Sequence, residues 1–222
     1  MDILIFGATG MVGQAVLREC LEASDVTRVV AVGRQSTGVV HERLSEIVTP
    51  DLTNLEAHRD RLAPFDASFF CLGVSSVGMN EADYTRVTYD LTLRVARLLV
   101  RENPQMTFTY VSGAGTDSTG TGKRMWARVK GGTENALIAL GFKGAYMFRP
   151  GVIQPMHAVR SKTTAYRVAS VIAKPLFGII RTFWPQSIVT SEEVGRAMLG
   201  VARRGYARAI LEVPDIQDAA RF

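Results

Sequence analysis

The sequence predicts an α/β fold: a doubly wound parallel sheet with a small C-terminal substrate-side lobe. Short β-rich runs alternate with helical patterns through the first two thirds of the 222 residues, an order that builds right-handed crossovers between parallel strands. The runs contain few polar positions, as expected for strands covered on both faces. The first run continues directly into a glycine-rich turn at residues 7–13, as the first strand of such sheets often does.

The expected strands are short runs rich in β-branched and aromatic residues. In chain order they are Ile3–Phe6, Val29–Val32, Glu46–Val48, Ser68–Cys71, Thr107–Val111 and Ala145–Phe148. Amphipathic stretches between them predict helices over residues 11–23, 81–102 and 125–140. In the second helix, Asn80 is placed to cap the N-terminus. One face of that helix carries Tyr84, Val87, Leu91, Val95 and Leu98.

The pattern changes after the turn Arg149-Pro150-Gly151. The remaining chain predicts a basic amphipathic segment (160–183), a capped helix (Ser191–Arg203) and a strand (Ala209–Val213). Residues 152–222 look too short to bury a core of their own. We therefore predict a single domain over residues 1–222, in which 152–222 contributes a small lobe on the substrate side.

The composition is that of a globular protein. Apolar residues make up 47% and charged residues 21% of the chain, which excludes disordered, collagen-like and mainly coiled-coil proteins. Two cysteines are too few for a disulfide scaffold, and the amino terminus has no signal-peptide pattern. We therefore expect a cytoplasmic protein. The three histidines lie far apart in the sequence and away from the cysteines, so no metal site is expected.

Positive charge is concentrated in one part of the chain. The net charge is +5, and residues 143–208 hold eleven Lys and Arg against two acids. An anionic substrate, a membrane surface, nucleic acid or solubility alone accounts for such a surplus. Nucleic acid is the least favoured, because no basic run alternates with aromatic residues. No apolar stretch is long enough to span a bilayer. For the segment 160–183 we favour a lid or a helix of a homodimer over peripheral membrane contact.

The glycine-rich turn predicts a dinucleotide site. Gly7, Gly10 and Gly13 are spaced three apart between a strand and a helix, a variant of the dinucleotide fingerprint. The first glycine allows a tight turn, the second lets the backbone approach a pyrophosphate, and the third permits close packing of the helix on the strand. The helix that begins there points free N–H groups at the phosphates. The site also includes Thr9, Met11 and Val12 of the same turn.

The end of the second strand favours NADP over NAD. An NAD site needs an acid here to bind the ribose diol, but residues 32–36 read Val-Gly-Arg-Gln-Ser. The guanidinium of Arg34 can pair with a 2′-phosphate and lie on adenine, and Ser36 can add a hydroxyl donor. The alternative is an ordinary solvated arginine.

The ends of the third and fourth strands complete the predicted cofactor site. Asp51 and Leu52 follow the third strand and are placed to flank adenine. Cys71, Leu72 and Gly73 end the fourth strand, and parallel sheets bind ligands at the carboxyl ends of their strands. No histidine lies near Cys71 in sequence, so its thiol is expected to be buried and unreactive.

These motifs occur together in the order seen in one superfamily. They are GATGMVG, Val32-Gly33-Arg34, Asp51-Leu52, Cys71-Leu72-Gly73, Val111-Ser112, VKGGTE and Arg149-Pro150-Gly151. The set resembles the atypical and extended short-chain dehydrogenase/reductases, nearest the NAD-dependent epimerase/dehydratase-like branch that includes the Tat-interacting-protein oxidoreductases. The resemblance covers most of residues 1–155. It implies a Rossmann fold and an NAD(P) cofactor, with the backbone of Pro150, Gly151 and Val152 approaching the nicotinamide.

The resemblance also implies a catalytic Ser/Tyr/Lys set. Ser112 matches the serine that polarises the substrate, and Lys130 matches the lysine that binds the nicotinamide ribose. The tyrosine position, four residues before that lysine, is occupied by Trp126. An indole N–H only donates a hydrogen bond and cannot exchange a proton. The glycine-rich stretch 113–122, which follows the serine, predicts a mobile loop.

Two functions from different classes follow. The first is an NADP-dependent oxidoreductase or epimerase-like enzyme that acts on an unknown small molecule, with an atypical proton donor. The second is a non-catalytic NADP(H)-binding sensor or scaffold. The other residues considered as proton donors, none supported by spacing, are Tyr84, Tyr89, Tyr110, Lys123 and Tyr166.

Overall fold

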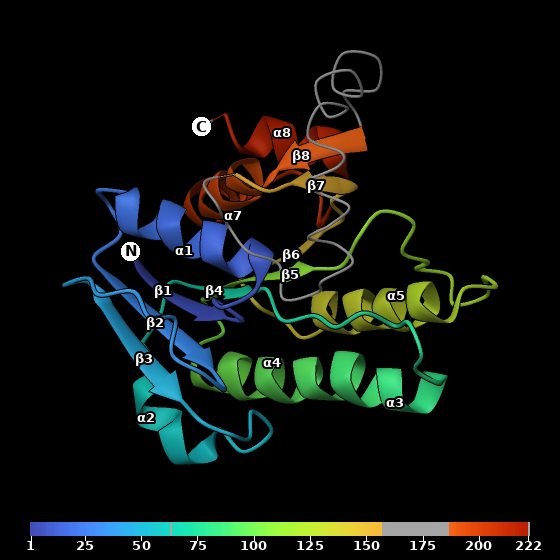
Figure 1. Cartoon of the computed structure of the whole chain (residues 1–222), viewed down its shortest axis with the longest axis horizontal. Helices are drawn as coiled ribbons and strands as arrows, with labels where there is room; N and C mark the ends of the chain where they lie inside the picture. The colour runs from blue at the N-terminus through green and yellow to red at the C-terminus, as the bar shows by residue number, and fades with distance from the viewer. Residues whose placement is uncertain (63, 157–186, 222) are drawn as a thin grey trace.

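The structure, a computed structural model, describes residues 1–62, 64–156 and 187–221. Within these residues, seven parallel strands form one sheet in the order β3-β2-β1-β4-β5-β6-β9 (Figure 1). The predicted doubly wound sheet is confirmed. Its strands are β1 (Asp2–Phe6), β2 (Arg28–Gly33), β3 (Leu44–Val48), β4 (Ala67–Phe70), β5 (Thr107–Val111), β6 (Gly144–Phe148) and β9 (Ile210–Leu211); β7 (Val152–Gln154) pairs separately with β8 (Ile188–Thr190).

The strand order reverses between β1 and β4. The chain runs outward from β1 through β2 to β3, then returns to β4 on the other side of β1 and continues to β5 and β6. At the carboxyl end of β1, Phe6 pairs with Val32 of β2 and with Phe70 of β4. Ligands of open α/β sheets bind beside such a reversal, because the loops there diverge and leave a crevice. Gly7, which directly follows β1, stands at this position.

Helices cover both faces of the sheet (Figure 1). One face carries α1 (Met11–Glu22), α7 (Ser191–Arg204) and α8 (Val213–Ala219). The other face carries α4 (Leu91–Glu102) and α5 (Met125–Ile138), together with the short helices η1 (Glu56–His58) and α2 (Arg59–Leu62). Helix α4 continues directly from α3 (Glu81–Thr85) and the π-helical turn η2 (Arg86–Asp90).

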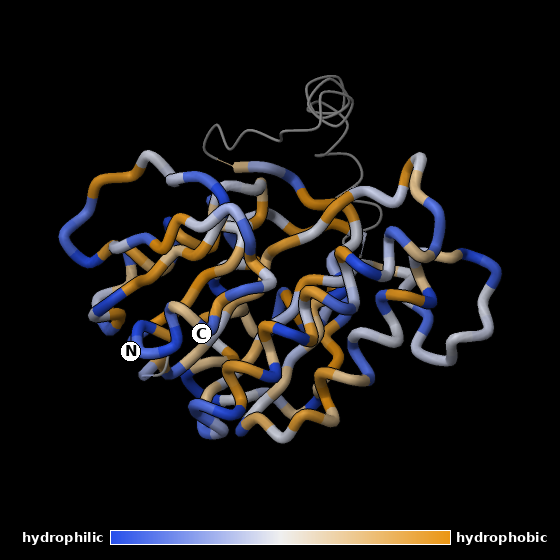
Figure 2. The backbone as a smooth tube through the Cα atoms, turned by 90° about the horizontal axis from the view of Figure 1, so that it is seen from below, coloured by the Kyte–Doolittle hydropathy of each residue, from blue (hydrophilic) through white to orange (hydrophobic). Residues whose placement is uncertain are grey.

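The two faces bury separate apolar cores. Alternate residues of a strand point to opposite faces, so Ile3 and Ile5 enter the core beneath α1 and α7, whereas Leu4 and Phe6 enter the core beneath α4. All four have no exposed surface. The covering helices alternate between hydrophobic and hydrophilic residues along their length (Figure 2). Burial on both sides explains why most of the strand sequences show little polar alternation.

The helix over residues 81–102 contains a π-helical turn that shifts its buried face. Asn80 caps this helix as predicted, because its side chain accepts a hydrogen bond from the Asp83 amide at 2.9 Å. The prediction for Val87 is wrong: its side chain is 39% exposed, and Thr88 is buried in its place. A π turn holds one residue more than an α turn, so the buried face advances by one position.

The C-terminal residues join the main fold. Thr190 and Glu193 form a reciprocal capping box at the start of α7, and α7 packs on α1 within one core. The predicted strand Ala209–Val213 is shorter than expected, because a second capping box at Glu212 begins α8.

The loop over residues 113–122, which the sequence predicts to be mobile, is anchored by hydrogen bonds. The Asp117 carboxylate accepts from the amides of Thr119 and Gly122 at 3.0 and 2.7 Å. The amide of Asp117 donates to the main-chain oxygen of Ala127 at 3.1 Å. These bonds fix the loop against the start of α5.

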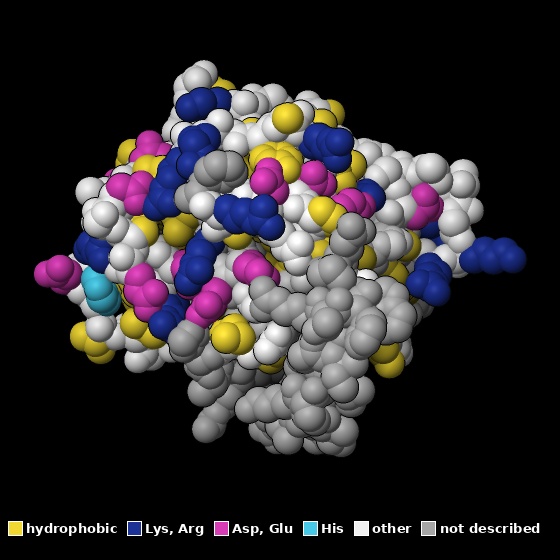
Figure 3. Space-filling model, turned by 90° about the horizontal axis from the view of Figure 1, so that it is seen from above, with side chains coloured by type: hydrophobic (Ala, Val, Ile, Leu, Met, Phe, Trp, Pro, Cys, Tyr) yellow, Lys and Arg dark blue, Asp and Glu magenta, His cyan; other side chains and the backbone are white. Residues whose placement is uncertain are grey.

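Several basic residues of the 143–208 region are neutralised by acids from outside it. The ion pairs are Arg149–Glu134, Arg196–Glu19, Arg203–Asp25 and Arg208–Asp215. Figure 3 shows a face on which Lys and Arg side chains lie interspersed with Asp and Glu. The whole predicted basic segment 160–183, with Tyr166, Arg160, Lys162, Arg167 and Lys174, lies outside the described residues.

No helix within the described ranges is long and apolar enough to cross a membrane. The same part of the chain brings together no group of three His, Cys, Asp or Glu side chains suited to a metal ion. Cys20 and Cys71 are both free thiols.

Candidate dinucleotide site

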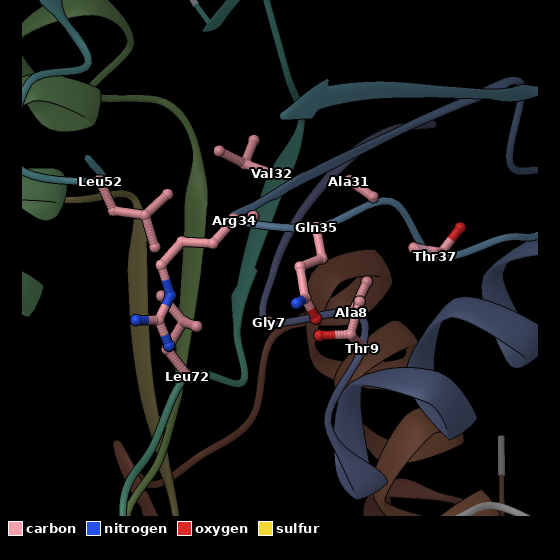
Figure 4. A pocket seen from close by; sticks show the side chains of 11 residues that line it. Gly7, Ala8, Thr9, Ala31, Val32, Arg34, Gln35, Thr37, Leu52 and Leu72 are labelled. Carbon is pink, nitrogen blue, oxygen red and sulfur yellow. The ribbon is translucent and has the colours of Figure 1, made fainter. Parts of the chain in front are cut away.

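A pocket of about 520 Å³ opens at the carboxyl ends of β1, β2 and β4, beside the reversal of strand order. This volume is typical of sites for small molecules. Its walls come from the glycine turn, from the end of β2 with the loop after it, and from the segments after β3 and β4 (Figure 4). The lining residues are Gly7, Ala8, Thr9, Ala31, Val32, Gly33, Arg34, Gln35, Thr37, Leu52 and Leu72.

Close contacts require glycine at two positions of the turn. Gly7 has a φ of +80°, and a Cβ there would lie 2.9 Å from the carbonyl carbon of Cys71. A Cβ on Gly13 would lie 2.1 Å from the main-chain oxygen of Gly7. These contacts allow the turn to lie on β4 and α1 to lie on the turn, which are the roles predicted for the first and third glycines.

The start of α1 presents unpaired amides beside the pocket. Gly10 is the N-cap residue, and the first bond of the helix runs from the Gln14 amide to the Gly10 oxygen at 2.8 Å. The amides of Met11, Val12 and Gly13 therefore have no acceptor within the helix. Such amides, at the positive end of the helix dipole, bind phosphate groups. The turn thus fits a dinucleotide, although these four residues do not form the pocket lining itself.

Arg34 extends across the pocket from the end of β2. Its side chain runs toward Leu72 and passes Leu52 (Figure 4). No carboxylate in the described part of the chain lies within ion-pair distance of its guanidinium. Arg34 is exposed, so the group is free to pair with an anionic ligand.

The other predicted residues of this region have different surroundings. Asp51 lies outside the lining, and hydrogen bonds from the side chain and the amide of Thr53 lower the pKa of its carboxyl. Cys71 does not line the pocket, its main chain packs against Gly7, and burial raises the pKa of its thiol to about 12, as expected of an unreactive thiol. Gly73 is exposed and also lies outside the lining.

Ser112 and Lys130 lie together at the end of β5. The Lys130 ammonium donates a hydrogen bond to the main-chain oxygen of Ser112. The Ser112 hydroxyl donates to the main-chain oxygen of Phe148 at 3.0 Å, and the residue is only 7% exposed. The structure therefore joins the predicted serine and lysine, but the hydroxyl bonds the neighbouring strand, and neither residue lines the pocket.

The surroundings of Lys130 disfavour the charged form of its side chain. Burial lowers the pKa of its ammonium to about 8, partly opposed by the nearby Glu134 carboxylate. Glu134 is itself engaged by Arg149, whose Nε donates to it at 3.0 Å. Lys130 therefore has no close carboxylate of its own among the described residues.

Trp126 stands one helical turn before Lys130 on α5 and is half-buried. Its ring lies against the loop after β5, because a Cβ built on Gly115 would be 3.8 Å from the Cη2 atom of the indole. Residues four apart share a helical face, so the indole is on the same side of α5 as the lysine.

Two of the tyrosines considered as alternative proton donors are core residues. Tyr84 and Tyr110 are 2% and 1% exposed, and burial raises the pKa of both phenols. Tyr89 lines a different groove on the outer side of α4. Lys123 is exposed on the loop before α5.

The turn after β6 connects several segments without entering the pocket. The Pro150 oxygen accepts from the Ala114 amide at 2.9 Å. A Cβ on Gly151 would lie 2.4 Å from the Ser187 oxygen, and Val152 is 47% exposed.

Sequence reasoning missed part of the lining. The missed residues are Ala8, Ala31, Val32, Gly33, Gln35 and Thr37. The signal that could have found Gln35 and Thr37 is their place in the loop after β2, which already holds Arg34. Ser36 from the same loop was predicted to bind the cofactor but does not line the pocket.

A family model described as "NAD dependent epimerase/dehydratase family" matches residues 3–123, more than half of the chain. The chain belongs to this family. The match includes the glycine turn, Arg34 and the end of β4, which are the parts that build the pocket. The protein is therefore an NAD(P)-binding protein of the oxidoreductase and epimerase type, and its cofactor is a nicotinamide dinucleotide. The predicted resemblance is confirmed.

Several individual proteins are similar to this chain in sequence or in fold. "Protein fmp52, mitochondrial" of Emericella nidulans is 25% identical over 205 residues, which cover 88% of this chain and 84% of that protein. "Protein HTATIP2" of Rattus norvegicus is 26% identical over 201 residues, covering 89% and 79%. A solved oxidoreductase of the short-chain dehydrogenase/reductase family from Burkholderia thailandensis has the same fold, with a TM-score of 0.67 at 20% identity, covering 98% of this chain and 92% of that one.

The predicted cytoplasmic location is wrong by this comparison, because several of the similar proteins are named as mitochondrial. The prediction came from the small number of cysteines and from the amino terminus. Free thiols indicate only a compartment that does not promote disulfides, and the cytoplasm is not the sole compartment of that kind.

Proposed function

We propose that this protein binds NADP(H) in preference to NAD(H) and acts on a small molecule as an oxidoreductase or epimerase-like enzyme. The nicotinamide supplies or accepts a hydride when bound. In this proposal Ser112 and Lys130 belong to the catalytic part of the site, and Trp126 takes the place of the usual tyrosine. The dinucleotide occupies the pocket, and its phosphates bind the amides at the start of α1.

The single observation that carries the cofactor preference is the position of Arg34. Its guanidinium lies in the pocket at the end of β2 and has no carboxylate partner in the described part of the chain. A guanidinium fork matches a phosphate in geometry and charge. An acid at the end of β2 would bind a ribose diol and repel a 2′-phosphate, and residues 32–36 contain none.

Lys130 has the properties of a group that positions a sugar. With a pKa of about 8, most of its ammonium is protonated at pH 7 and can donate to hydroxyl groups. Trp126 can hold a substrate oxygen through its indole N–H but cannot give up and regain that proton. Turnover by the native chain is therefore expected to be slow relative to a tyrosine variant.

Calorimetric titration with NADPH and with NADH tests the cofactor preference. We expect NADPH to bind more tightly, and Arg34→Ala to weaken NADPH binding about tenfold to a hundredfold while leaving NADH binding nearly unchanged. That range corresponds to a hydrogen bond with a charged partner. Arg97→Ala is the matched control, because Arg97 is an exposed arginine on α4 outside the pocket.

If neither dinucleotide binds at high micromolar concentration, the cofactor role of the pocket and the proposed enzyme are both contradicted. Equal dissociation constants of the native chain for NADPH and NADH would contradict the preference alone, and an equal loss of affinity for both in Arg34→Ala would contradict the role of Arg34 in that preference.

A second candidate is a non-catalytic NADP(H)-binding sensor or scaffold. Two observations favour it: the tryptophan at the tyrosine position, and the bond that engages the Ser112 hydroxyl with Phe148. Such a protein would bind NADPH as above but show no consumption of it with any carbonyl substrate.

We also propose that residues 1–222 form one domain, to which 152–222 contribute the substrate-side lobe. The support is that β9 extends the main sheet and that α7 shares a core with α1. On this view a fragment of residues 1–151 does not fold alone, which circular dichroism and thermal unfolding can check.

A homodimer stays a prediction, which sedimentation velocity can test.

A further inference from the structure

Glu46 of β3 lies beneath the loop that follows β2. Its Oε1 accepts a hydrogen bond from the Thr37 amide at 2.7 Å and another from the Thr37 hydroxyl at 2.6 Å. The Ser36 hydroxyl also donates to this carboxylate. A strand adjacent to β2 therefore holds the same loop that carries Arg34.

The Glu46 carboxylate is ionised and has no cation of its own. Partial burial opposes its charge, but the hydrogen bonds from Ser36 and Thr37 prevail and lower its pKa. Within the described residues it forms no ion pair. Arg61 donates to the main-chain oxygen of Glu46 at 3.2 Å, not to the carboxylate.

These bonds decide what the loop offers to a ligand. A hydroxyl group has one proton to donate, and Ser36 and Thr37 both give theirs to Glu46. A 2′-phosphate consists of acceptor atoms only and needs donors. Thr37 lines the pocket, yet its hydroxyl proton is directed to the carboxylate. Of these three side chains, Arg34 alone keeps its donors available to the phosphate.

We propose that Glu46 is a specificity-determining residue of the dinucleotide site, one that limits the preference for NADPH. It withholds two hydroxyl donors from the 2′-phosphate and sets a negative charge beside the pocket, in opposition to Arg34. The acid that is missing from the end of β2 is thus supplied by the next strand, and the site accepts both NADPH and NADH. This inference rests on the proposed binding of NADP(H).

The test compares the dissociation constants of NADPH and NADH for the full chain and for Glu46→Gln. Glutamine keeps the size and one acceptor oxygen but removes the charge. We expect the preference, expressed as the NADH constant divided by the NADPH constant, to rise about two- to tenfold. This is the order of magnitude expected for the loss of one charge near a phosphate in water-exposed surroundings. Glu42→Gln, an exposed acid on the segment before β3, should leave the preference unchanged.

A second variant, Thr37→Val, examines the donor argument directly. If the hydroxyl proton is committed to Glu46, its removal leaves the NADH constant divided by the NADPH constant within about twofold of the native ratio. A fall of about tenfold in that ratio would mean that Thr37 donates to the phosphate, and would overturn the inference. Thermal unfolding of each variant identifies a loss of fold, and a general loosening of the loop cancels in the ratio of the two constants.

The failures of the two proposals can be told apart. A native chain that binds neither dinucleotide contradicts the proposed function, and the inference fails with it. A native chain that binds both, with a preference unchanged or lowered in Glu46→Gln, overturns the inference and leaves the proposed function standing.

Discussion

Glu134 and Arg149 form an ion pair that is almost completely buried. The Glu134 side chain has no exposed surface, and the Arg149 side chain is 11% exposed. The guanidinium donates to both carboxylate oxygens, with Nε at 3.0 Å from Oε1. It also donates to the Ser118 hydroxyl and to Glu212. One arginine at the end of β6 therefore joins α5, the loop after β5 and the start of α8.

Removal of Arg149 should destabilise the fold strongly. In Arg149→Ala the Glu134 carboxylate stays buried without a cation, which typically costs about 3–5 kcal/mol of the free energy of unfolding. Urea denaturation measures the change, and Arg97→Ala on the exposed side of α4 should stay within about 0.5 kcal/mol of the native chain. Adding Glu134→Gln to Arg149→Ala removes the buried charge and should recover part of the loss. A single variant as stable as the native chain would show that Glu134 is not buried and charged.

Two glycine variants should move stability in opposite directions. Gly13→Ala would set a methyl group 2.1 Å from the Gly7 oxygen, so α1 must separate from the glycine turn. We expect a loss of stability and of dinucleotide binding. Gly132→Ala is the matched control, because a Cβ there meets nothing within 4 Å on α5. It should stabilise the protein by about 0.5–1 kcal/mol through helix propensity. Thermal unfolding and calorimetry give both readings, and a Gly13→Ala variant with native binding would contradict the close packing.

The stability contributed by Lys130 should depend on pH. Its folded-state pKa is lowered to about 8, whereas the ammonium in the unfolded chain titrates at about 10.4. Between these values the unfolded state binds more protons, so the free energy of unfolding rises with pH. The native chain is therefore expected to gain stability relative to Lys130→Met as the pH is raised from 8 to 10. Urea denaturation over this range provides the comparison, and parallel curves for the two proteins would mean that the lysine is not desolvated.

Replacing Trp126 by tyrosine should increase turnover. A phenol at this position lies one turn from Lys130 and can exchange a proton, a contribution typically worth about 10²- to 10⁴-fold in rate. The assay follows NADPH consumption with a panel of carbonyl compounds. Trp126→Phe serves as the control, because it opens space without adding a proton donor. If Trp126→Tyr binds NADPH normally and remains inactive with every compound, the sensor function is favoured over the enzyme.

Most of the fold was predictable because its signals are local. The strands β1 and β2 are almost continuous apolar runs, and double coverage by helices makes such runs necessary. The face of the helix at residues 81–102 was predicted less well. Val87 fits an α-helical stripe, but a π turn, which the pattern does not reveal, moves Thr88 inward instead.

In the candidate site, too, some features were predictable from local sequence and others were not. Gly7, Arg34 and Leu72 were predicted from their positions at strand ends and do line the pocket. Ser36 and Ser112 were predicted from residue type and position, yet the structure directs their hydroxyls to Glu46 and to Phe148. These acceptors lie ten and thirty-six residues away in the chain, so no local pattern connects them.

The sequence by itself determined the parallel sheet, the glycine turn and the family, because each depends on neighbouring residues: an apolar run, a spacing of three, a strand followed by a helix. The tertiary structure alone decided how protons and charges are distributed at the site. It paired Glu134 with Arg149, placed Glu46 beneath the loop that carries Arg34, and buried the ammonium of Lys130 beside Ser112. The physical reason is that a hydrogen bond or an ion pair depends on distance in space, and only the folded chain brings these groups within reach of one another.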